Sequence, residues 1–427
     1  MAAEARLARV IGAVNIGSFR ISAMVAGIGE GGELVVLGSG HRAAQGIKRG
    51  YVTDMVAATY AVRDAVERAE KHAGTQVQGV WIGCSGAGLA STTTPVETQV
   101  GGRRIEDEDL EQLLLTAREA IEPDGRMVLH AQPGLYTLDG ADGIADPRGL
   151  HAERLGVDIH VVRADGAPMR NLREVVQNAH LDVEGVVAAP LAAGQACLTA
   201  EERELGVALV EFGAQVTNVS VHGGGNLLGL TALGRGSADI TDALASAFGI
   251  RRFQAERLKC VHGSAVASPT DHRERIPVGG PGEEPSGPPP RGADERGRIP
   301  RAELIGVIAG ELARLASEIG RSLERMGFAA SHARPLVLTG GGAELAGLAD
   351  YMQAALGHPV RIGRPPAIKG LAEVHGGPGF ATLAGLVLYA HDDPVDIRAI
   401  GPRHQLAHRP AGFAAAIRVW RALKENF

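Results

Sequence analysis

The sequence has few aromatic side chains: phenylalanine, tryptophan and tyrosine together make up only 4% of its 427 residues. Proteins that bind single-stranded nucleic acids often stack the bases on aromatic rings, so this scarcity argues against such a binding platform. Basic charge is not in excess either, because the formal net charge is −6. A nucleic-acid partner requires a basic face, so no nucleic-acid binding is expected.

Cysteines and long apolar runs are also scarce. Cys84, Cys197 and Cys260 lie far apart in the chain and show no metal-type spacing, so no metal site is predicted from them. Reduced thiols are typical of cytosolic proteins. The first residues lack the apolar core of a signal peptide, and no run reaches the 18 apolar residues of a spanning helix. We therefore expect a cytosolic body.

The residues that are abundant predict globular α/β structure. Hydrophobic residues make up 45% of the chain, and its length suggests about three compact units. Short apolar runs alternate with helical patterns, which favours the α/β class. Strands are expected over residues 10–16, 20–26 and 33–37, and an amphipathic helix over residues 52–69.

The second half of the chain restarts the same plan. Val14-Asn15-Ile16-Gly17 is followed ten residues later by Gly27, and Val210-Glu211-Phe212-Gly213 is followed ten residues later by Gly223. Both copies carry a polar side chain before the turn and a strand after it. A duplicated α/β unit forms a cleft between two similar halves, which is a common place for a ligand site.

Two segments are predicted to be linkers. Residues 277–300 and 392–412 are rich in proline, glycine and charged residues, and this composition is too polar to pack into a core. His404 and His408, in the second linker, are four residues apart. Without a flanking helix or a third ligand, two solvated histidines are expected rather than a metal site.

Three glycine-containing turns could place backbone N–H groups against phosphate oxygens. They occupy residues 15–20, 211–215 and 338–343, and small residues there let the chain approach a ligand closely. The third turn follows an apolar strand over residues 335–338 and precedes a helix expected from Glu344. An ordinary strand-to-helix turn is the alternative for this segment taken alone.

The three turns resemble, in their order, those of the actin-like nucleotide-binding fold, and further segments resemble the FtsA family of bacterial cell-division proteins. Residues 91–161, with Asp146-Pro147-Arg148-Gly149-Leu150, are similar to the small subdomain of that family. Residues 201–207 and 255–263 are similar to its second half. The resemblance implies an α/β, actin/Hsp70-like duplicated nucleotide-binding fold, with a small α+β subdomain inserted in the first half and a C-terminal amphipathic helix.

The resemblance also implies how the chain is divided. A first lobe at 1–90 and 162–203 would be interrupted by the inserted subdomain at 91–161. The second lobe would comprise phosphate strands at 204–235, an upper subdomain at 236–334 with a disordered 277–300, and an adenosine motif at 335–391. A flexible linker at 392–412 and a membrane-targeting helix at 413–427 would follow.

The cofactors implied by the resemblance are ATP and Mg²⁺, bound between the lobes. Glu256 and Lys259 would lie near the ribose and adenine, although a solvated helix pair is an alternative for them. The implied nucleotide-binding residues are Asn15, Gly17, Ser18, Phe19, Arg20, Glu211, Gly213, Ala214, Gln215, Glu256, Lys259, Gly340, Gly341, Gly342 and Ala343.

Several of these residues depart from the family pattern. Asn15 stands where relatives usually have an acidic residue, and an amide brings no charge to hold Mg²⁺. Glu211 replaces an aspartate, and Ala214 and Gln215 replace glycines that would approach phosphate. Arg20 keeps a cation where relatives often have a lysine. We therefore expect nucleotide binding with at most weak hydrolysis, and we assign no catalytic residue.

The end of the chain has a helical apolar stripe with arginines on the opposite side, which favours membrane attachment over packing on the body. Five large apolar side chains at about 1.5–3 kcal/mol each set an upper bound near ~10 kcal/mol. Partial burial leaves roughly the affinity of a single acyl chain, so linked copies would be needed for firm attachment. The implied membrane residues are Phe413, Ile417, Arg418, Trp420, Arg421, Leu423, Lys424 and Phe427.

The resemblance implies a cell-division scaffold on the cytoplasmic side of the inner membrane at the septum. Its implied partners are the C-terminal tail of the tubulin-like GTPase FtsZ, docking on residues 236–334, later divisome proteins, further copies in a filament, and an anionic membrane surface. A small-molecule kinase of the same fold, a pilus or cell-shape scaffold and a chaperone-like ATPase are the alternatives. A kinase would need an intact acidic phosphate turn and a catalytic carboxylate.

Overall fold

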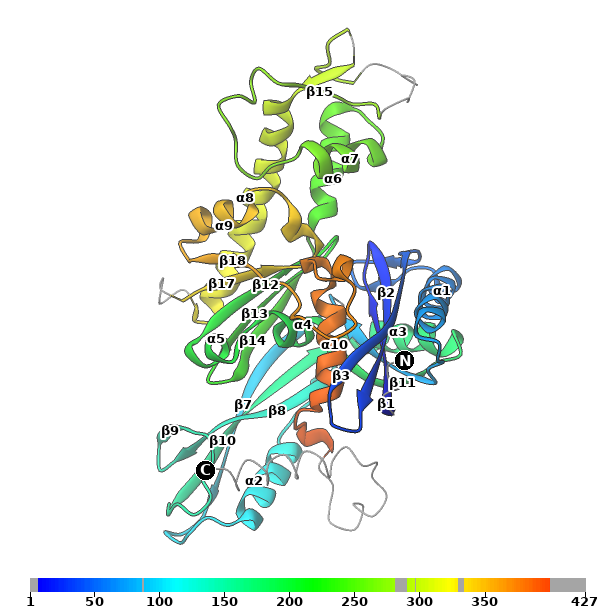
Figure 1. Cartoon of the computed structure of the whole chain (residues 1–427). Coiled ribbons are helices and arrows are strands. Elements are labelled where there is room, and N and C mark those ends of the chain that lie inside the picture. The colour runs from blue at the N-terminus through cyan, green and yellow to red at the C-terminus, as the bar shows by residue number, and fades with distance from the viewer. Residues whose placement is uncertain (1–6, 87, 281–289, 296, 329–333, 400–427) are drawn as a thin grey trace.

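The computed structural model describes residues 7–86, 88–280, 290–295, 297–328 and 334–399, and Figure 1 shows two lobes with further subdomains above and below them. The first lobe is built on a five-stranded sheet in the order β11-β6-β1-β2-β3. Its strands are β1 (Leu7–Ile16), β2 (Arg20–Gly29), β3 (Leu34–Ala43), β6 (Gly79–Cys84) and β11 (Asp182–Ala188). The three expected strands are confirmed, and each is longer than predicted.

The second lobe repeats the pairing of the first. Its strands are β12 (Val207–Phe212), β13 (Thr217–Gly223), β14 (Asn226–Leu233), β17 (Leu336–Thr339) and β18 (Val360–Ile362), in the order β18-β17-β12-β13-β14. β1 pairs antiparallel with β2 and parallel with β6, and β12 pairs antiparallel with β13 and parallel with β17. The predicted duplication is therefore present in the strand topology.

Small residues let helix α1 (Met55–Ala73) pack closely on the first sheet. Asp54 caps the helix by accepting a hydrogen bond of 3.0 Å from the N–H of Ala57, and Gly74 ends it with φ of 69°. The buried face of α1 is mostly alanine, and a Cβ on Gly38 of β3 would overlap the backbone at Ala69. Helix α3 (Gly166–Asn178) packs beside α1.

Two helices, α4 (Ala189–Cys197) and α10 (Ala381–Asp392), cross between the lobes. They contact each other closely, because Gly385 leaves no room for a Cβ against the carbonyl oxygen of Ala192. Leu383, Leu386 and Val387 of α10 belong to the core of the first lobe, whereas Ala193 and Cys197 of α4 pack with the second. This crossing fixes the floor of the space between the lobes.

The inserted subdomain consists of β7 (Ala90–Gln99), α2 (Asp107–Glu119), β8 (Met127–Leu138), β9 (Ala141–Ile144) and β10 (Arg154–Ala164). It is α+β, as expected, and it interrupts the first half of the sequence. In space, however, its sheet continues the sheet of the second lobe through the pair Thr231 and Ala90. The insertion is therefore joined by its strands to the second lobe.

The upper subdomain is helical and carries α6 (Ser237–Phe248), α7 (Arg252–His262) and α8 (Arg301–Arg325). α8 buries Leu304, Ile308, Leu312, Leu315 and Ile319, whose spacing of three and four gives one apolar face. The prediction of a disordered 277–300 is wrong for the described part of that segment. β15 (Arg275–Pro277) pairs with β16 (Arg298–Pro300), and Val278 and Ile299 are buried.

Two other expectations need correction. The segment after α10 is not a free linker up to residue 399, because a 3₁₀ turn at Ile397–Ala399 packs on the inserted subdomain and fully buries Ile397. The helix expected from Glu344 begins later: a 3₁₀ turn occupies Gly341–Glu344, and α9 spans Leu348–Leu356. The remaining short elements are β4 (Ile47–Lys48), β5 (Tyr51–Val52), α5 (Ala200–Leu205), and 3₁₀ turns at Glu373–His375 and Pro378–Phe380.

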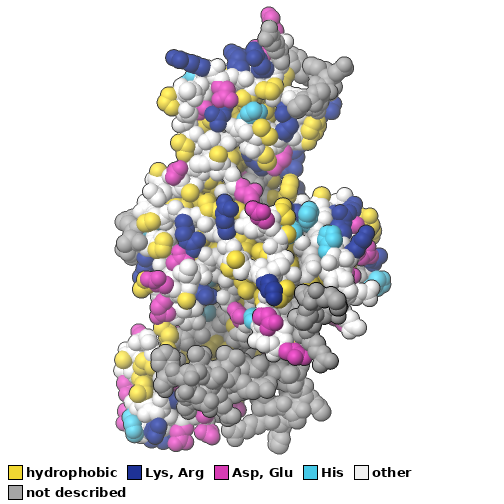
Figure 2. All heavy atoms as spheres, in the orientation of Figure 1, with side chains coloured by type: hydrophobic (Ala, Val, Ile, Leu, Met, Phe, Trp, Pro, Cys, Tyr) yellow, Lys and Arg dark blue, Asp and Glu magenta, His cyan; other side chains and the backbone are white. Residues whose placement is uncertain are grey.

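The tail predicted to target the membrane, 413–427, lies outside the described residues, as do His404 and His408. Within the described ranges, no helix combines the length and the apolar character needed to cross a membrane. Over the described part of the face in Figure 2, basic and acidic side chains are interspersed and neither forms a broad patch.

Candidate functional site

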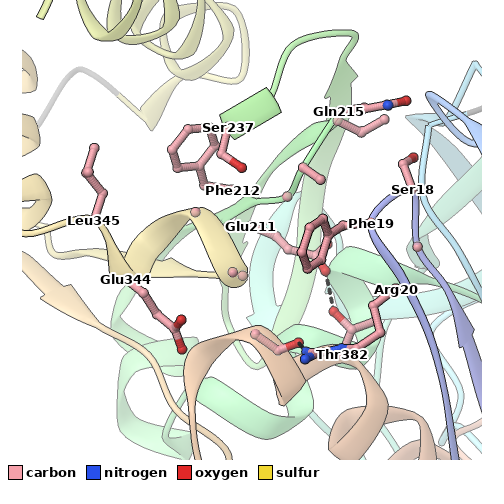
Figure 3. Close-up of a pocket in the computed structure, with 18 of the residues that line it drawn as sticks. Ser18, Phe19, Arg20, Glu211, Phe212, Gln215, Ser237, Glu344, Leu345 and Thr382 are labelled. Carbon is pink, nitrogen blue, oxygen red and sulfur yellow. Dashed lines mark hydrogen bonds between the residues drawn. The ribbon is translucent and has the colours of Figure 1, made fainter. Parts of the chain in front are cut away.

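A cavity of about 690 Å³ lies between the two lobes, and all three predicted turns line it. Figure 3 shows Ser18, Phe19 and Arg20 entering from the β1–β2 turn, with Glu344 and Leu345 on the wall across from them. The predicted residues that line the cavity are Asn15, Gly17, Ser18, Phe19, Arg20, Glu211, Gly213, Ala214, Gln215, Glu256, Lys259, Gly340, Gly341 and Gly342. Residues far apart in the sequence are thus brought to one place.

Ala343 is the exception among the predicted residues. Its side chain is only 4% exposed and belongs to the apolar core of the second lobe, so it does not line the cavity. The 3₁₀ turn that begins at Gly341 rotates this side chain inward. Gly340 has φ of 85°, and a Cβ there would lie 2.6 Å from the carbonyl oxygen of Phe212. This glycine is required for the third turn to approach the second.

The first two turns have the same close backbone contact. A Cβ on Gly17 would lie 2.8 Å from the carbonyl oxygen of Arg20, and a Cβ on Gly213 would lie 2.7 Å from that of Val216. In both cases the glycine precedes the contacted carbonyl by three residues. The tight turns leave their backbone beside the cavity, where phosphate groups of a ligand could meet N–H donors.

Glu211 lies at the base of the cavity and is bound by its neighbours. One carboxylate oxygen accepts a hydrogen bond from the hydroxyl of Thr382, and the other accepts one of 2.7 Å from the amide of Asn218. Burial raises the pKa of Glu211, and these two hydrogen bonds offset only part of the effect. The Glu211 side chain, which is longer than the aspartate that it replaces, is thus held by protein groups on both of its oxygens.

Amides and hydroxyls surround this carboxyl group. Asn15, the last residue but one of β1, pairs across the sheet with Ser22, which is buried beside the cavity. Asn218 donates a second hydrogen bond, of 2.8 Å, to Ser85 of the first lobe. Its own Oδ1 is buried without a hydrogen-bond partner among the described protein atoms. The base of the cavity is therefore polar, and Glu211 is its acidic group.

Arg20 is held in place by the segment that leads into α10. Its guanidinium stacks over the ring of Phe380 at 3.9 Å and donates a hydrogen bond of 3.4 Å to the carbonyl oxygen of Gly379. Burial lowers the pKa of Arg20, and the nearby charge of Glu344 opposes that shift. The cation predicted for this turn is present on the cavity wall.

Glu256, which is half-buried, and Lys259, which is buried, form an ion pair at the other end of the cavity. Lys259 is only 8% exposed, so the alternative of a solvated helix pair is wrong. Its ammonium group donates to Glu256 at 2.8 Å, to Thr241 at 2.9 Å and to the carbonyl oxygen of Ser237 at 3.1 Å. Burial alone would raise the pKa of Glu256, but the hydrogen bonds from Lys259 and Thr241 lower it.

The second turn also reaches the first lobe. Gln215 accepts a hydrogen bond of 2.9 Å from the backbone N–H of Arg49, and Arg49 donates 3.3 Å to Asp239 of α6. In Figure 3 the Gln215 side chain points away from the cavity. Gln215, which replaces a glycine of the family pattern, therefore turns its side chain away from the cavity and joins the lobes instead.

Sequence reasoning missed several lining residues. Phe380 ends the Pro378–Phe380 turn and Thr382 follows it in α10. This segment carries no recognisable ligand motif, and it reaches the cavity because α10 crosses beneath it. Ser85 follows β6 and could have been proposed from its place at a strand end next to β1. Ser237 and Cys260 line the cavity from α6 and α7.

The fit of a divalent cation can be tested on these contacts. Mg²⁺ prefers carboxylate oxygens that are free to coordinate. Both oxygens of Glu211 are engaged, Asn15 is uncharged, and Glu256 is paired with Lys259. Among the residues that the structure describes, no group of three or more His, Cys, Asp or Glu side chains is placed to hold a metal. The residues of the cavity do not fit Mg²⁺.

Family models match two regions of the chain: "SHS2 domain inserted in FTSA" matches residues 86–163, and "Cell division protein FtsA" matches residues 208–385. The chain is 32% identical to Cell division protein FtsA of Agrobacterium fabrum over 99% of this chain and 96% of that protein. It is 33% identical to Cell division protein FtsA of Rhizobium meliloti over 98% of this chain and 95% of that protein. It is 29% identical to Cell division protein FtsA of Escherichia coli over 90% of this chain and 91% of that protein.

Solved structures share the fold. The PilM-PilN type IV pilus biogenesis complex matches with a TM-score of 0.62 at 18% identity, covering 92% of this chain and 99% of that chain. MreB5 of Spiroplasma citri bound to ADP matches with a TM-score of 0.51 at 11% identity, covering 90% and 96%. At these identities the similarity shows an actin-like fold alone, and it confirms the predicted fold class.

Proposed function

The chain belongs to the FtsA family of cell division proteins, and on that premise we propose that it is a scaffold that tethers the division ring to the cytoplasmic face of the inner membrane. In this proposal the ring is formed by the tubulin-like GTPase FtsZ, whose C-terminal tail docks on the upper subdomain. The scaffold also recruits later divisome proteins at the septum.

The observation that carries the nucleotide part of the proposal is the convergence of three glycine turns on one cavity of about 690 Å³. An adenine nucleotide would place its phosphates at the turns of Gly17 and Gly213 and its base and ribose near Glu256 and Lys259. Backbone N–H groups would bind the phosphate oxygens, and Arg20 would supply a positive charge. The neighbour MreB5 of Spiroplasma citri, bound to ADP, supports this assignment by its shared fold.

Hydrolysis of the nucleotide is not part of the proposed function. Phosphoryl transfer depends on positioning and on neutralising charge, usually with a metal ion. Glu211 is held by Thr382 and Asn218 and so is poorly placed to orient an attacking water. We therefore assign the cleft a binding role, in which the nucleotide biases self-association of the chain into filaments.

The proposed membrane anchor is the amphipathic sequence 413–427. A single copy should bind a bilayer only marginally, about as well as one acyl chain, so a filament that links many copies would bind far more firmly. The proposal therefore connects nucleotide binding, self-association and attachment in that order. The absence of a spanning helix among the described residues is compatible with it but does not carry it.

Sedimentation with anionic liposomes tests this proposal. The full chain is compared with a chain that ends at Gly412, each with and without ATP. We expect the full chain to sediment with the liposomes, the shortened chain to stay in the supernatant, and ATP to increase the bound fraction of the full chain. Equal sedimentation of the two chains would contradict the proposed anchor, and forced monomers that bind as tightly as assembled protein would contradict the role of avidity.

A further inference from the structure

Two hydrogen bonds of the protein itself join the two lobes at the cavity. Asn218 of the second lobe donates to Ser85 of the first at 2.8 Å. Gln215 of the second lobe accepts from the backbone of Arg49 in the first at 2.9 Å. We infer that this cleft binds its adenine nucleotide without a divalent cation, an inference that rests on the nucleotide binding proposed above.

The three carboxylates that line the cavity all interact with other protein groups. Glu211 accepts hydrogen bonds on both oxygens, and burial favours its neutral form. Glu256 is bound to Lys259 and Thr241. Glu344 is exposed on the wall of the third turn, across from the β1–β2 turn, and its charge acts on Arg20. Mg²⁺ binds one or two carboxylates together with phosphate oxygens, and none of these three groups offers that combination.

The end of β1 beside the cavity carries a neutral side chain in place of a metal ligand. Asn15 is the last residue but one of β1, and its side-chain oxygen faces Gly83 of β6, since a Cβ on that glycine would lie 3.3 Å from it. An amide oxygen is a weaker ligand for Mg²⁺ than a carboxylate, because it carries no net charge. A site with such neutral side chains therefore gains little binding free energy from taking up a hydrated Mg²⁺ ion.

The charge of the phosphates can be met without an ion. Arg20 lies on the cavity wall, and the tight turns at Gly17 and Gly213 leave backbone N–H groups beside the cavity. Donors fixed in this way bind anions and need no reorganisation when the ligand arrives. Because hydrogen bonds of the protein already join the lobes, a metal ion is not needed to hold them together either.

Calorimetric titration of ADP and ATP into the full chain, once in excess magnesium chloride and once in excess EDTA, tests this inference. We expect dissociation constants that agree within about twofold between the two buffers, because no ion is part of the bound complex. A constant that is about tenfold weaker or more in EDTA would overturn the inference while leaving nucleotide binding intact. Absence of binding in both buffers would instead overturn the proposed nucleotide site, and the inference with it.

A gain-of-function variant makes the test sharper. Asn15→Asp combined with Thr382→Val supplies a second carboxylate and removes one hydrogen bond from Glu211. We expect this variant to bind ATP several-fold more tightly in magnesium than in EDTA. Asn171→Asp, on an exposed position of α3 outside the cavity, is the matched control and should keep metal-independent binding. Metal-dependent binding by the control and the wild type alike would overturn the inference; thermal unfolding verifies that each variant is folded.

Discussion

The two halves of the molecule have the same strand order and the same turn, but their turns carry different side chains. β11-β6-β1-β2-β3 in the first lobe corresponds to β18-β17-β12-β13-β14 in the second. A Cβ added to the turn glycine would lie almost equally close to the carbonyl oxygen three residues later, at 2.8 Å for Gly17 and 2.7 Å for Gly213. Strand pairing and close contact constrain the backbone in both halves, whereas the chemistry of the side chains could diverge.

The side chains of the two turns differ in charge and polarity. The first turn carries Asn15, Phe19 and Arg20, which are neutral, apolar and cationic, and the second carries the buried Glu211. In each half a polar side chain of the turn contacts the protein: Arg20 stacks on Phe380, and Glu211 accepts a hydrogen bond from Thr382. A cleft can therefore keep the geometry of a nucleotide site while its polar groups stabilise the protein itself.

Because the two turns have the same backbone geometry, adding a methyl group to the glycine of either turn should destabilise the fold by the same amount. Gly17→Ala and Gly213→Ala should each lower the free energy of unfolding by about 2 kcal/mol, since each Cβ meets a backbone oxygen that cannot move freely. Urea unfolding curves measure this. Gly234→Ala is the control, because a Cβ there would meet nothing within 4 Å. A difference above about 1 kcal/mol between the two variants would show that the turns are not equivalent.

The buried carboxyl group of the second half predicts a pH effect that the first half cannot have. The folded-state pKa of Glu211 is raised, so its contribution to stability is present below the unfolded pKa and lost as pH rises through the folded pKa. Glu211→Gln does not titrate and should become more stable than the wild type by about 1 kcal/mol at about pH 8.

Unfolding free energies of Glu211→Gln and of the wild type at about pH 5 and about pH 8 measure this effect. The advantage of the variant should shrink at the lower pH. Glu30→Gln, which changes an exposed carboxyl group, is the control and should show no such trend. Parallel pH profiles for Glu211→Gln and the wild type would contradict the raised pKa of this group.

The first turn should bind nucleotide better when its aromatic side chain is removed. Phe19 is 64% exposed and enters the cavity beside the turn. Phe19→Ser frees space for phosphate, and we expect the dissociation constant of a fluorescent ADP analogue to fall about threefold, or about 0.6 kcal/mol. Phe253→Ser is the control, because that ring is 53% exposed on α7 and does not line the cavity. Weaker binding would indicate that Phe19 contacts the ligand.

The smallest effect is expected where the halves touch at the surface. The Arg49 guanidinium lies 3.3 Å from Asp239, but the arginine side chain is 51% exposed. Arg49→Ala should therefore change the free energy of unfolding by less than about 0.5 kcal/mol, because solvent screens such pairs. Lys48→Ala, at the neighbouring exposed position, is the control for thermal unfolding. A larger loss would mean that this contact holds the lobes together.

Local features were predictable from the sequence. The strands around Gly17 and Gly213 follow from apolar runs that a glycine turn interrupts, and the echo between the halves predicted the duplicated fold. The three turns also gave a large part of the cavity lining, because glycine lets the backbone at a strand end approach a ligand closely. Ala343 was misplaced, since the sequence does not reveal that a 3₁₀ turn directs it into the core.

Features that depend on long-range pairing were not predictable. The inserted subdomain is attached to β14 through the strand pairing of Thr231 with Ala90, and no local sequence pattern predicts this pairing. Ile276 and Ile299 pair across a proline-rich segment whose composition indicates disorder. Thr382 reaches Glu211 because α10 crosses beneath the cleft. In each case, contacts between distant parts of the chain override what the local composition favours.

Photolabelling tests most directly the central claim that the two halves enclose an adenine nucleotide. The full chain is irradiated with 8-azido-ADP, and the labelled peptides are mapped by mass spectrometry. We expect the label on the α7 peptide that contains Glu256, Lys259 and Cys260, or on the neighbouring peptide of the third turn, and we expect excess ADP to abolish it. Labelling that ADP does not displace, or that falls outside the residues lining this cavity, would contradict the account.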